Sequence, residues 1–249
     1  MKNALRSFLI ISILAIFSTG CSIYHPQAVD IPLINHSGDT RIDASVGLSY
    51  WPIPSTVTLN GTVTHGFNDW FAGQLHGNYG GGSNFYLQGA PGVYYPLGEH
   101  AVLEGYAGVG FGSARSGEAK PTSELSSGNN YSYKGTFLLP FGQINFGWHD
   151  LTLLHIDLAI GMKTGAYMPN FNYHEVDNNG NLIATSVYDY TTTNFLLEPQ
   201  LMLRLGVESV KLNVKFGYAW LSDIYGENSH AKKLYSDLAT ISVGLTFLF

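Results

Sequence analysis

The last nine residues, ISVGLTFLF from Ile241 to Phe249, place apolar side chains at every second position. Small or polar residues, Ser242, Gly244 and Thr246, separate the apolar ones over most of this stretch. A period of two is typical of a β-strand whose two faces meet different surroundings. The chain is therefore predicted to close on a strand that ends in an aromatic residue.

The same period of two recurs upstream and predicts ten strands between residues 40 and 249. These strands cover Thr40–Trp51, Thr56–His65, Asp69–Tyr79, Asn84–Tyr95, Ala101–Gly112, Tyr133–Trp148, Leu154–Lys163, Phe195–Leu205, Val210–Trp220 and Leu238–Phe249. In the sixth strand the apolar phase slips between Phe141 and Ile144, and Pro140 lies inside the segment. Both features predict a β-bulge there.

The lengths of the connections between the strands distinguish a membrane barrel from a soluble β-sandwich. Short gaps follow the second, fourth, sixth and eighth strands, at Gly66, Pro96, His149 and Gly206. Long polar gaps cover roughly residues 113–131, 163–193 and 222–236. Short periplasmic turns, long extracellular loops and an even strand number are typical of outer-membrane proteins. We therefore expect an all-β fold, an antiparallel up-and-down transmembrane β-barrel of about ten strands.

Composition and the N-terminus indicate a secreted chain. Only 12% of residues are charged against 14% aromatic, and the net charge of −6 with no basic patch argues against nucleic acid as a partner. Lys2 and Arg6 precede an apolar run and the sequence STGC, which predicts a signal peptide over residues 1–20. Cys21 is the single cysteine and stands where a lipoprotein signal places the lipidated residue, the alternative being a free N-terminal Cys21. Residues 21–39 are expected to form a periplasmic arm, and residues 40–249 the barrel.

Two stretches resemble known proteins. The C-terminal strand resembles the signal by which the barrel-assembly machinery recognises outer-membrane proteins, with Leu245, Phe247 and Phe249 as its apolar positions. The arm resembles the start of small outer-membrane β-barrel lipoproteins of Bacteroidota, through the positions Tyr24, Pro26, Pro32, Leu33, Gly38 and Asp39. The resemblance implies the outer membrane of a Gram-negative bacterium, with outer-membrane lipid and the assembly machinery as partners. It implies no activity.

Charged and titratable residues on the face opposite the apolar one are predicted to line the barrel interior. They are Asp43, Glu104, His155, Asp157, Lys163, Glu198, Arg204, Lys211 and Lys215. Opposite signs on neighbouring strands favour a structural network, because charge inside a barrel is costly unless paired. Within the hairpin of the eighth and ninth strands, Glu198 is expected diagonal to Lys215.

Function is less constrained than fold. We expect a structural or surface-interaction role without catalysis, cofactor or metal, in which the long loops meet an extracellular ligand or protein. A narrow pore for small solutes or ions is the alternative, since ten strands enclose little more than side chains fill. An outer-membrane hydrolase is a weaker alternative, for which the last outer loop offers Ser229 and His230.

Overall fold

The computed structural model describes residues 22–24, 31–51, 53–80, 84–115, 130–151, 155–176, 182–191, 193–221, 235–236 and 239–249. The predicted signal peptide, Cys21, Ser229 and His230 lie outside the described residues. Within the described part of the chain, no helix is long and apolar enough to cross a membrane.

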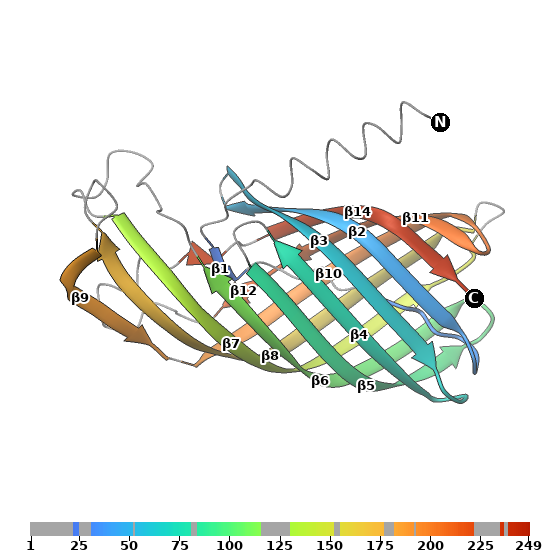
Figure 1. Cartoon of the computed structure of the whole chain (residues 1–249). Helices are drawn as coiled ribbons and strands as arrows, with labels where there is room; N and C mark the ends of the chain where they lie inside the picture. The colour runs from blue at the N-terminus through green and yellow to red at the C-terminus, as the bar shows by residue number, and fades with distance from the viewer. Residues whose placement is uncertain are drawn as a thin grey trace, which may run out of the picture.

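Ten long strands form one closed antiparallel ring, which confirms the predicted fold class. They are β2 (Thr40–Trp51), β3 (Ile53–Gly66), β4 (Phe71–Gly80), β5 (Asn84–Leu97), β6 (Ala101–Arg115), β7 (Asn130–Trp148), β8 (Asp157–Val176), β10 (Asn194–Val207), β11 (Val210–Tyr218) and β14 (Ala239–Leu248). Each pairs with the next, and β8 pairs with β10. The ring closes where β14 pairs with β2, from Ala239 opposite Tyr50 to Leu248 opposite Arg41. Figure 1 shows these strands tilted across the barrel, with the C-terminus at the end that carries the short turns.

The outer surface of the barrel is apolar. Alternate positions of β11 are exposed and buried, with Leu212, Val214 and Phe216 outward and Lys211, Asn213 and Lys215 inward. Around the middle of the ring the usual arrangement of a soluble protein is inverted. Large apolar side chains are exposed there, and many Asp, Glu, Lys, Arg, Asn and Gln side chains are buried inside. An apolar belt around a closed ring is what a bilayer requires, since hydrocarbon cannot satisfy an open strand edge. This barrel is therefore a transmembrane one.

The sixth predicted strand, now β7, has no bulge, so that expectation was wrong. The β6–β7 register runs without a shift from Ala101 opposite Trp148 to Arg115 opposite Lys134. Phe137, Leu139 and Phe141 all point inward and are buried. The apparent slip of phase arises because this part of the interior is itself apolar, so both faces of β7 carry apolar residues.

Two strands extend far beyond the barrel wall. β7 and β8 continue their pairing out to Asn130 opposite Val176, and β9 (Leu182–Tyr190) pairs with the end of β8. The seventh strand was expected to end near Lys163, and the structure continues it for a further 13 residues to Val176. Figure 1 shows this three-stranded extension at the end opposite the C-terminus. We call that end the outer or extracellular end and the opposite one the periplasmic end, after the topology that the sequence predicts.

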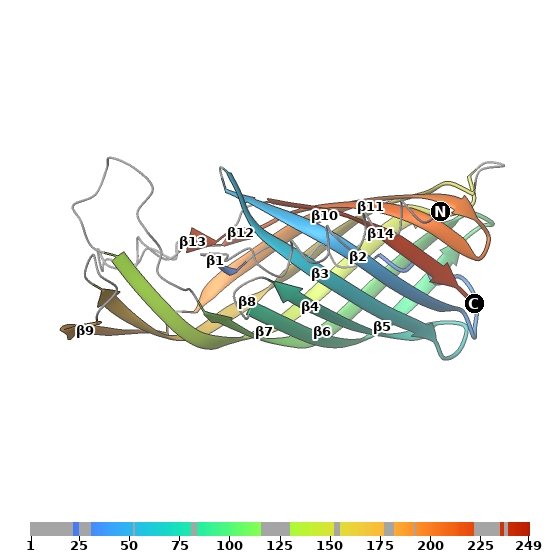
Figure 2. The same ribbon diagram turned by 45° about the horizontal axis from the view of Figure 1, so that its top comes forward.

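The N-terminal arm lies inside the barrel, and not in the periplasm as expected. We use this term for the described residues 22–24 and 31–39. β1 (Ser22–Tyr24) pairs with β13 (Tyr235–Ser236), close to β12 (Trp220–Leu221) at the outer end of the barrel. Figures 1 and 2 both show β1 within the outline of the barrel beside these two short strands. Ile31, Leu33 and Ile34 have no exposed surface, and Thr40 then starts β2 at the periplasmic end.

Candidate functional site

The barrel interior is the candidate site, because the predicted charged residues converge there. The residues placed inside and buried are Asp43, Glu104, Asp157, Lys163, Glu198, Arg204, Lys211 and Lys215. They face inward because they occupy alternate strand positions between outward apolar residues.

His155 differs from that group and corrects the prediction. It lies before β8, in the turn that follows β7, with a φ of 45° and about a third of its side chain exposed. Its Nδ1 atom lies 3.1 Å from Asp150 Oδ1. The period of two had been extended through Leu154, but the strand begins only at Asp157, so alternation could not place His155 inside.

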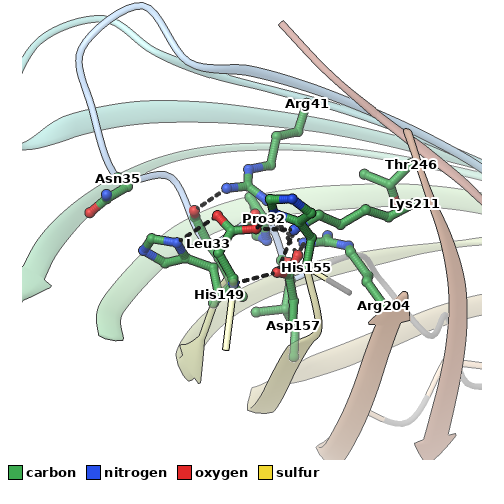
Figure 3. A network of polar contacts seen from close by, with 12 residues as sticks. Pro32, Leu33, Asn35, Arg41, His149, His155, Asp157, Arg204, Lys211 and Thr246 are labelled. Atoms are coloured by element: carbon green, nitrogen blue, oxygen red, sulfur yellow. Dashed lines mark hydrogen bonds and ion pairs between the residues drawn. The ribbon is translucent and has the colours of Figure 1, made fainter. Parts of the chain in front are cut away.

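A charged cluster that we call the periplasmic network lies inside the barrel near the short turns and comprises Arg41, Asp150, Asp157, Arg204 and Lys211. Figure 3 shows Arg41, Asp157, Arg204 and Lys211 of this network. Its centre is the buried Asp157 carboxylate, which lies 2.6 Å from Lys211 Nζ. The same carboxylate lies 3.6 Å from Arg204 Nη1 and 3.9 Å from Arg41 Nη1. Lys211 also contacts Asp150 Oδ1 at 2.8 Å. Two carboxylates thus face three cations, and the Asp150 side chain is 42% exposed. Each guanidinium has five N–H donors, so the two arginines can bind further acceptors beside these carboxylates.

Backbone carbonyls of the N-terminal arm supply those acceptors. Arg204 donates from Nη2 to the Ile31 carbonyl at 2.8 Å and from Nη1 to the Pro32 carbonyl at 3.3 Å. Arg41 Nη2 donates to the Leu33 carbonyl at 2.6 Å. Leu33 has a φ of 57°, a conformation that costs a residue other than glycine about 1–2 kcal/mol. The two arginines and the buried Leu33 side chain together hold the arm in that conformation.

Glu104 binds the next residue of the arm, Ile34, as a hydrogen-bond acceptor, whereas the arginines bind the arm as donors. Its Oε1 atom accepts a hydrogen bond from the Ile34 backbone N–H at 2.8 Å, and Oε2 accepts one from Asn145 at 3.1 Å. Arginines therefore bind the arm's carbonyls while a glutamate binds its N–H. This pattern recognises backbone and so depends little on the identity of the arm's side chains.

Two neighbouring residues of the turn after β7, His149 and Asp150, have shifted pKa values. Burial raises the pKa of Asp150, but hydrogen bonds from Lys211, His149 and His155 outweigh it and hold that pKa well below its ordinary value. Burial lowers the pKa of His149, and Arg41 adds to the effect. The folded turn therefore favours an ionised Asp150 beside a neutral His149.

A second cluster lies further toward the outer end, around Glu198. Lys163 Nζ lies 3.8 Å from Glu198 Oε2 and donates to Gln88 Oε1 at 3.1 Å. Tyr24 of the arm donates its hydroxyl proton to the same Glu198 oxygen at 2.7 Å. Lys163 also lies over the Tyr86 ring, 5.3 Å from its centroid. Glu198 thus links the arm to two barrel strands.

The third cluster crosses the seam where β14 meets β2. Lys215 Nζ lies 2.5 Å from Asp43 Oδ1, and Asp43 also accepts from Asn213 and from Thr246. The expected contact between Glu198 and Lys215 was wrong. The two-residue turn between β10 and β11 sets Lys215 opposite Met202, four residues from Glu198.

Aromatic rings fill the interior around the Glu198 cluster. Tyr24 packs edge-on against Phe137 at 6.1 Å and Tyr167 at 5.4 Å, and Tyr86 stacks on Phe137 at 5.7 Å. Gly112 leaves the space that the Phe137 ring occupies, since a Cβ atom there would lie 2.2 Å from the ring. The arm's own tyrosine thus packs among aromatic side chains of the barrel wall at this level.

A small hollow of about 310 Å³ opens at the periplasmic end. Its lining comes from the arm, the turns and the C-terminus: Asn35, His36, Asp39, Thr40, Arg41, His149, Asp150, Glu208, Ser209, Leu248 and Phe249. Among the described residues, no group of three or more His, Cys, Asp or Glu side chains is placed to hold a metal ion. We find no nucleophile and base pair in this lining that geometry marks as catalytic.

Sequence reasoning missed Arg41, Asp150 and Tyr24 as members of these clusters. Arg41 lies at the start of β2, where its inward position follows from the same alternation that places Asp43. Tyr24 and Asp150 carry no such signal, since one belongs to the arm and the other to a turn. The one available hint was the apolar run IPLI at residues 31–34, which a tether in water would have left exposed.

Comparisons with known proteins are limited to architecture. No protein-family model and no curated protein matches the chain. Among solved structures, it is similar to a protein from "De novo design of transmembrane beta-barrels", at 10% identity and a TM-score of 0.34, covering 86% of this chain and 97% of that one. It is similar to a "Bacterial polysaccharide outer membrane secretin" at 9% identity and a TM-score of 0.25, covering 87% and 99%. A third likeness is to OmpT, an outer membrane protein of Vibrio cholerae, at 9% identity and a TM-score of 0.21, covering 85% and 96%. The description of the barrel rests on its own register and closure.

Proposed function

We propose that this chain is a self-plugged outer-membrane barrel of a Gram-negative bacterium, without catalytic activity, whose working surface is its extracellular end. The observation that carries the proposal is the arm inside the barrel. Ile31, Leu33 and Ile34 are fully buried there, and Tyr24 lies among the aromatic rings further out. An interior filled by side chains and by the chain's own N-terminal segment leaves the loops and the β7–β8–β9 extension to meet partners.

The extension suits a role in surface interaction. Its strands stand beyond the membrane-crossing part of the wall, and among the described strands β9 pairs only with β8. A strand with one open edge offers backbone N–H and C=O groups to another protein. The extracellular partner is a protein or ligand still to be identified.

Lipidation of Cys21 and recognition of Phe249 by the assembly machinery are part of this proposal. Inhibition of the lipoprotein signal peptidase should leave an uncleaved precursor, and mass spectrometry of the mature N-terminal peptide should find acyl chains on Cys21. A mature N-terminus with an unmodified cysteine would overturn that part.

Planar-bilayer conductance tests the plugged state. We would introduce the pair Ile31→Cys and Gly161→Cys, because a Cβ atom at Gly161 would lie 3.5 Å from Ile31 Cγ1. A Cys21→Ser background makes these two the only thiols of the chain. Formation of the disulfide would itself place the arm inside the barrel. The native chain and the oxidised variant should show no stable conductance steps. Steps through the oxidised, locked variant would overturn the proposal.

A gated pore is the second candidate, and one observation favours it. The arm is held inside by hydrogen bonds to its backbone, a mode of binding that can be reversed without a change of fold. A variant that lacks residues 22–36 removes the buried part of the arm while it keeps every barrel strand. Stable steps in that variant, together with silence of the native chain, would support a pore that the arm keeps closed.

A further inference from the structure

The cations of this chain are distributed unevenly. Two of the twelve Lys and Arg residues belong to the predicted signal peptide, and five are buried in the interior: Arg41, Lys163, Arg204, Lys211 and Lys215. Three more, Lys120, Lys232 and Lys233, belong to the sequences of the long outer connections. The remaining two, Arg115 and Lys134, are exposed on the outward face of the wall at its outer end.

Arg115 and Lys134 face each other directly. The β6–β7 register makes them cross-strand partners, and both side chains are exposed. Partners of this kind hold their Cβ atoms about 4.5–5.5 Å apart, and like charges there are destabilising. The Arg115 backbone is fixed in this position, because its N–H donates to Asn84 Oδ1 at 2.8 Å. The fold therefore holds two positive charges side by side.

Among the described residues, no carboxylate in the same row of the sheet lies close enough to neutralise this pair. Lys134 is opposite Asn172 of β8, and Asn172 is opposite Asp189 of β9. Asp189 thus lies two strands from Lys134, about 10 Å away at the usual strand spacing. Within the described part of the sheet, an anion that neutralises the pair must therefore come from elsewhere.

The height of the pair on the wall indicates which anion. Phe111 and Leu138 are the last outward apolar pair on β6 and β7, and Ser113 and Thr136 come next. Arg115 and Lys134 follow four residues beyond the apolar pair, which is about 10 Å along the membrane normal for a tilted strand. The polar zone of one leaflet is about 5–8 Å thick. Long Arg and Lys side chains bend back toward that zone, where lipid phosphates lie.

We propose that Arg115 and Lys134 form a binding site for a phosphate group of an outer-leaflet lipid. The guanidinium offers paired N–H donors that match phosphate oxygens, and the ammonium adds a second charge on the other side. The bound phosphate converts a repulsive cross-strand pair into a bridged one. The site is independent of the arm and of whether the barrel conducts.

Native mass spectrometry of the detergent-purified full chain tests this site. The probes are lipid A with both phosphates, the same lipid without phosphate, and inorganic phosphate as a competitor. The double variant Arg115→Gln, Lys134→Gln should bind bisphosphorylated lipid A at least tenfold more weakly than the native chain. The exchanged variant Arg115→Lys, Lys134→Arg keeps one guanidinium and one ammonium in the pair and should bind within about threefold of native, because both charges and one set of paired N–H donors remain. Competition by millimolar inorganic phosphate would assign the site to free phosphate and overturn the lipid assignment.

A stability measurement separates a binding site from a merely tolerated pair. Without lipid, the double Gln variant should unfold at a higher denaturant concentration than the native chain, because it relieves the repulsion. With phosphorylated lipid A the order should reverse. An unchanged order, or equal binding of the lipid without phosphate, would overturn the proposal.

Discussion

Replacement of Arg204 by methionine should loosen the N-terminal arm while it leaves the barrel closed. Arg204 donates two hydrogen bonds to arm carbonyls, at 2.8 and 3.3 Å. Hydrogen bonds from a charged group contribute about 1.5–3 kcal/mol each, so the arm should lose roughly 3–6 kcal/mol of binding. Methionine keeps most of the aliphatic length, so packing around the site changes little. Asp157 keeps Lys211 at 2.6 Å and therefore remains paired.

A loss of 3 kcal/mol raises the population of the released arm by about two orders of magnitude. Maleimide labelling measures that population directly, at a single thiol introduced as Ile31→Cys in the Cys21→Ser background. The labelling rate should rise by about 100-fold in the Arg204→Met variant if the arm loses about 3 kcal/mol of binding, and by more if it loses more.

Lys215→Met is the matched control for this experiment. It removes one buried interior charge as Arg204→Met does, but its partner is Asp43 at the seam and not the arm. It should lower barrel stability without faster labelling at position 31. An Arg204→Met rate within threefold of native, or an equal rise in both variants, would refute the assignment of Arg204 as the arm's anchor.

Three further predictions concern the barrel itself. Stability should fall as the pH drops from 7, first below about 6.5 because the lowered pKa of His149 disfavours its protonation in the folded state. It should fall again below about 4, because the pKa of Asp150 is lower in the folded than in the unfolded state and its contribution is lost as the pH falls toward the folded value. Urea titrations of native and Asp150→Asn chains check this, and equal slopes below pH 4 would contradict it. Gly112→Leu places atoms in the space of the Phe137 ring and should lower the free energy of unfolding by about 1–3 kcal/mol, measured by heat-modified mobility on gels. Phe249→Ala should reduce the folded fraction in the outer membrane without a change in the unfolding midpoint of the purified barrel, and a normal folded yield would argue against an assembly signal there.

Alternation of apolar and polar residues predicted most of the barrel, because each strand lies between the membrane hydrocarbon and the polar interior. Lys211, Asn213 and Lys215 alternate with Leu212, Val214 and Phe216, and a one-residue error would place charges in hydrocarbon. The same rule placed Asp157 and Arg204 inside. Pairing within the interior was less predictable, because the partner of Glu198 depends on the length of a turn and on which strands are neighbours.

The position of the arm could not be predicted from a period. Residues 31–34 contain no alternation, and Pro32 excludes a ladder hydrogen bond. The guanidinium groups near Asp157 show why this segment is inside, since its carbonyls accept their hydrogen bonds. The position of these donors becomes known only after strand register has been fixed.

Because the arm continues directly into β2, the barrel acts as a receptor whose ligand is tethered to it. The described link between the buried Ile34 and Thr40 is only a few residues long, and a short tether holds its ligand at an effective concentration of the order of millimolar or higher. A soluble competitor would have to exceed that concentration, or bind far more tightly than the arm does, before it displaced the plug. If the arm gates a pore, as in the second candidate function, its mechanical withdrawal faces no such competition. A partner that pulls on the chain would then open the pore more readily than a solute that diffuses into it.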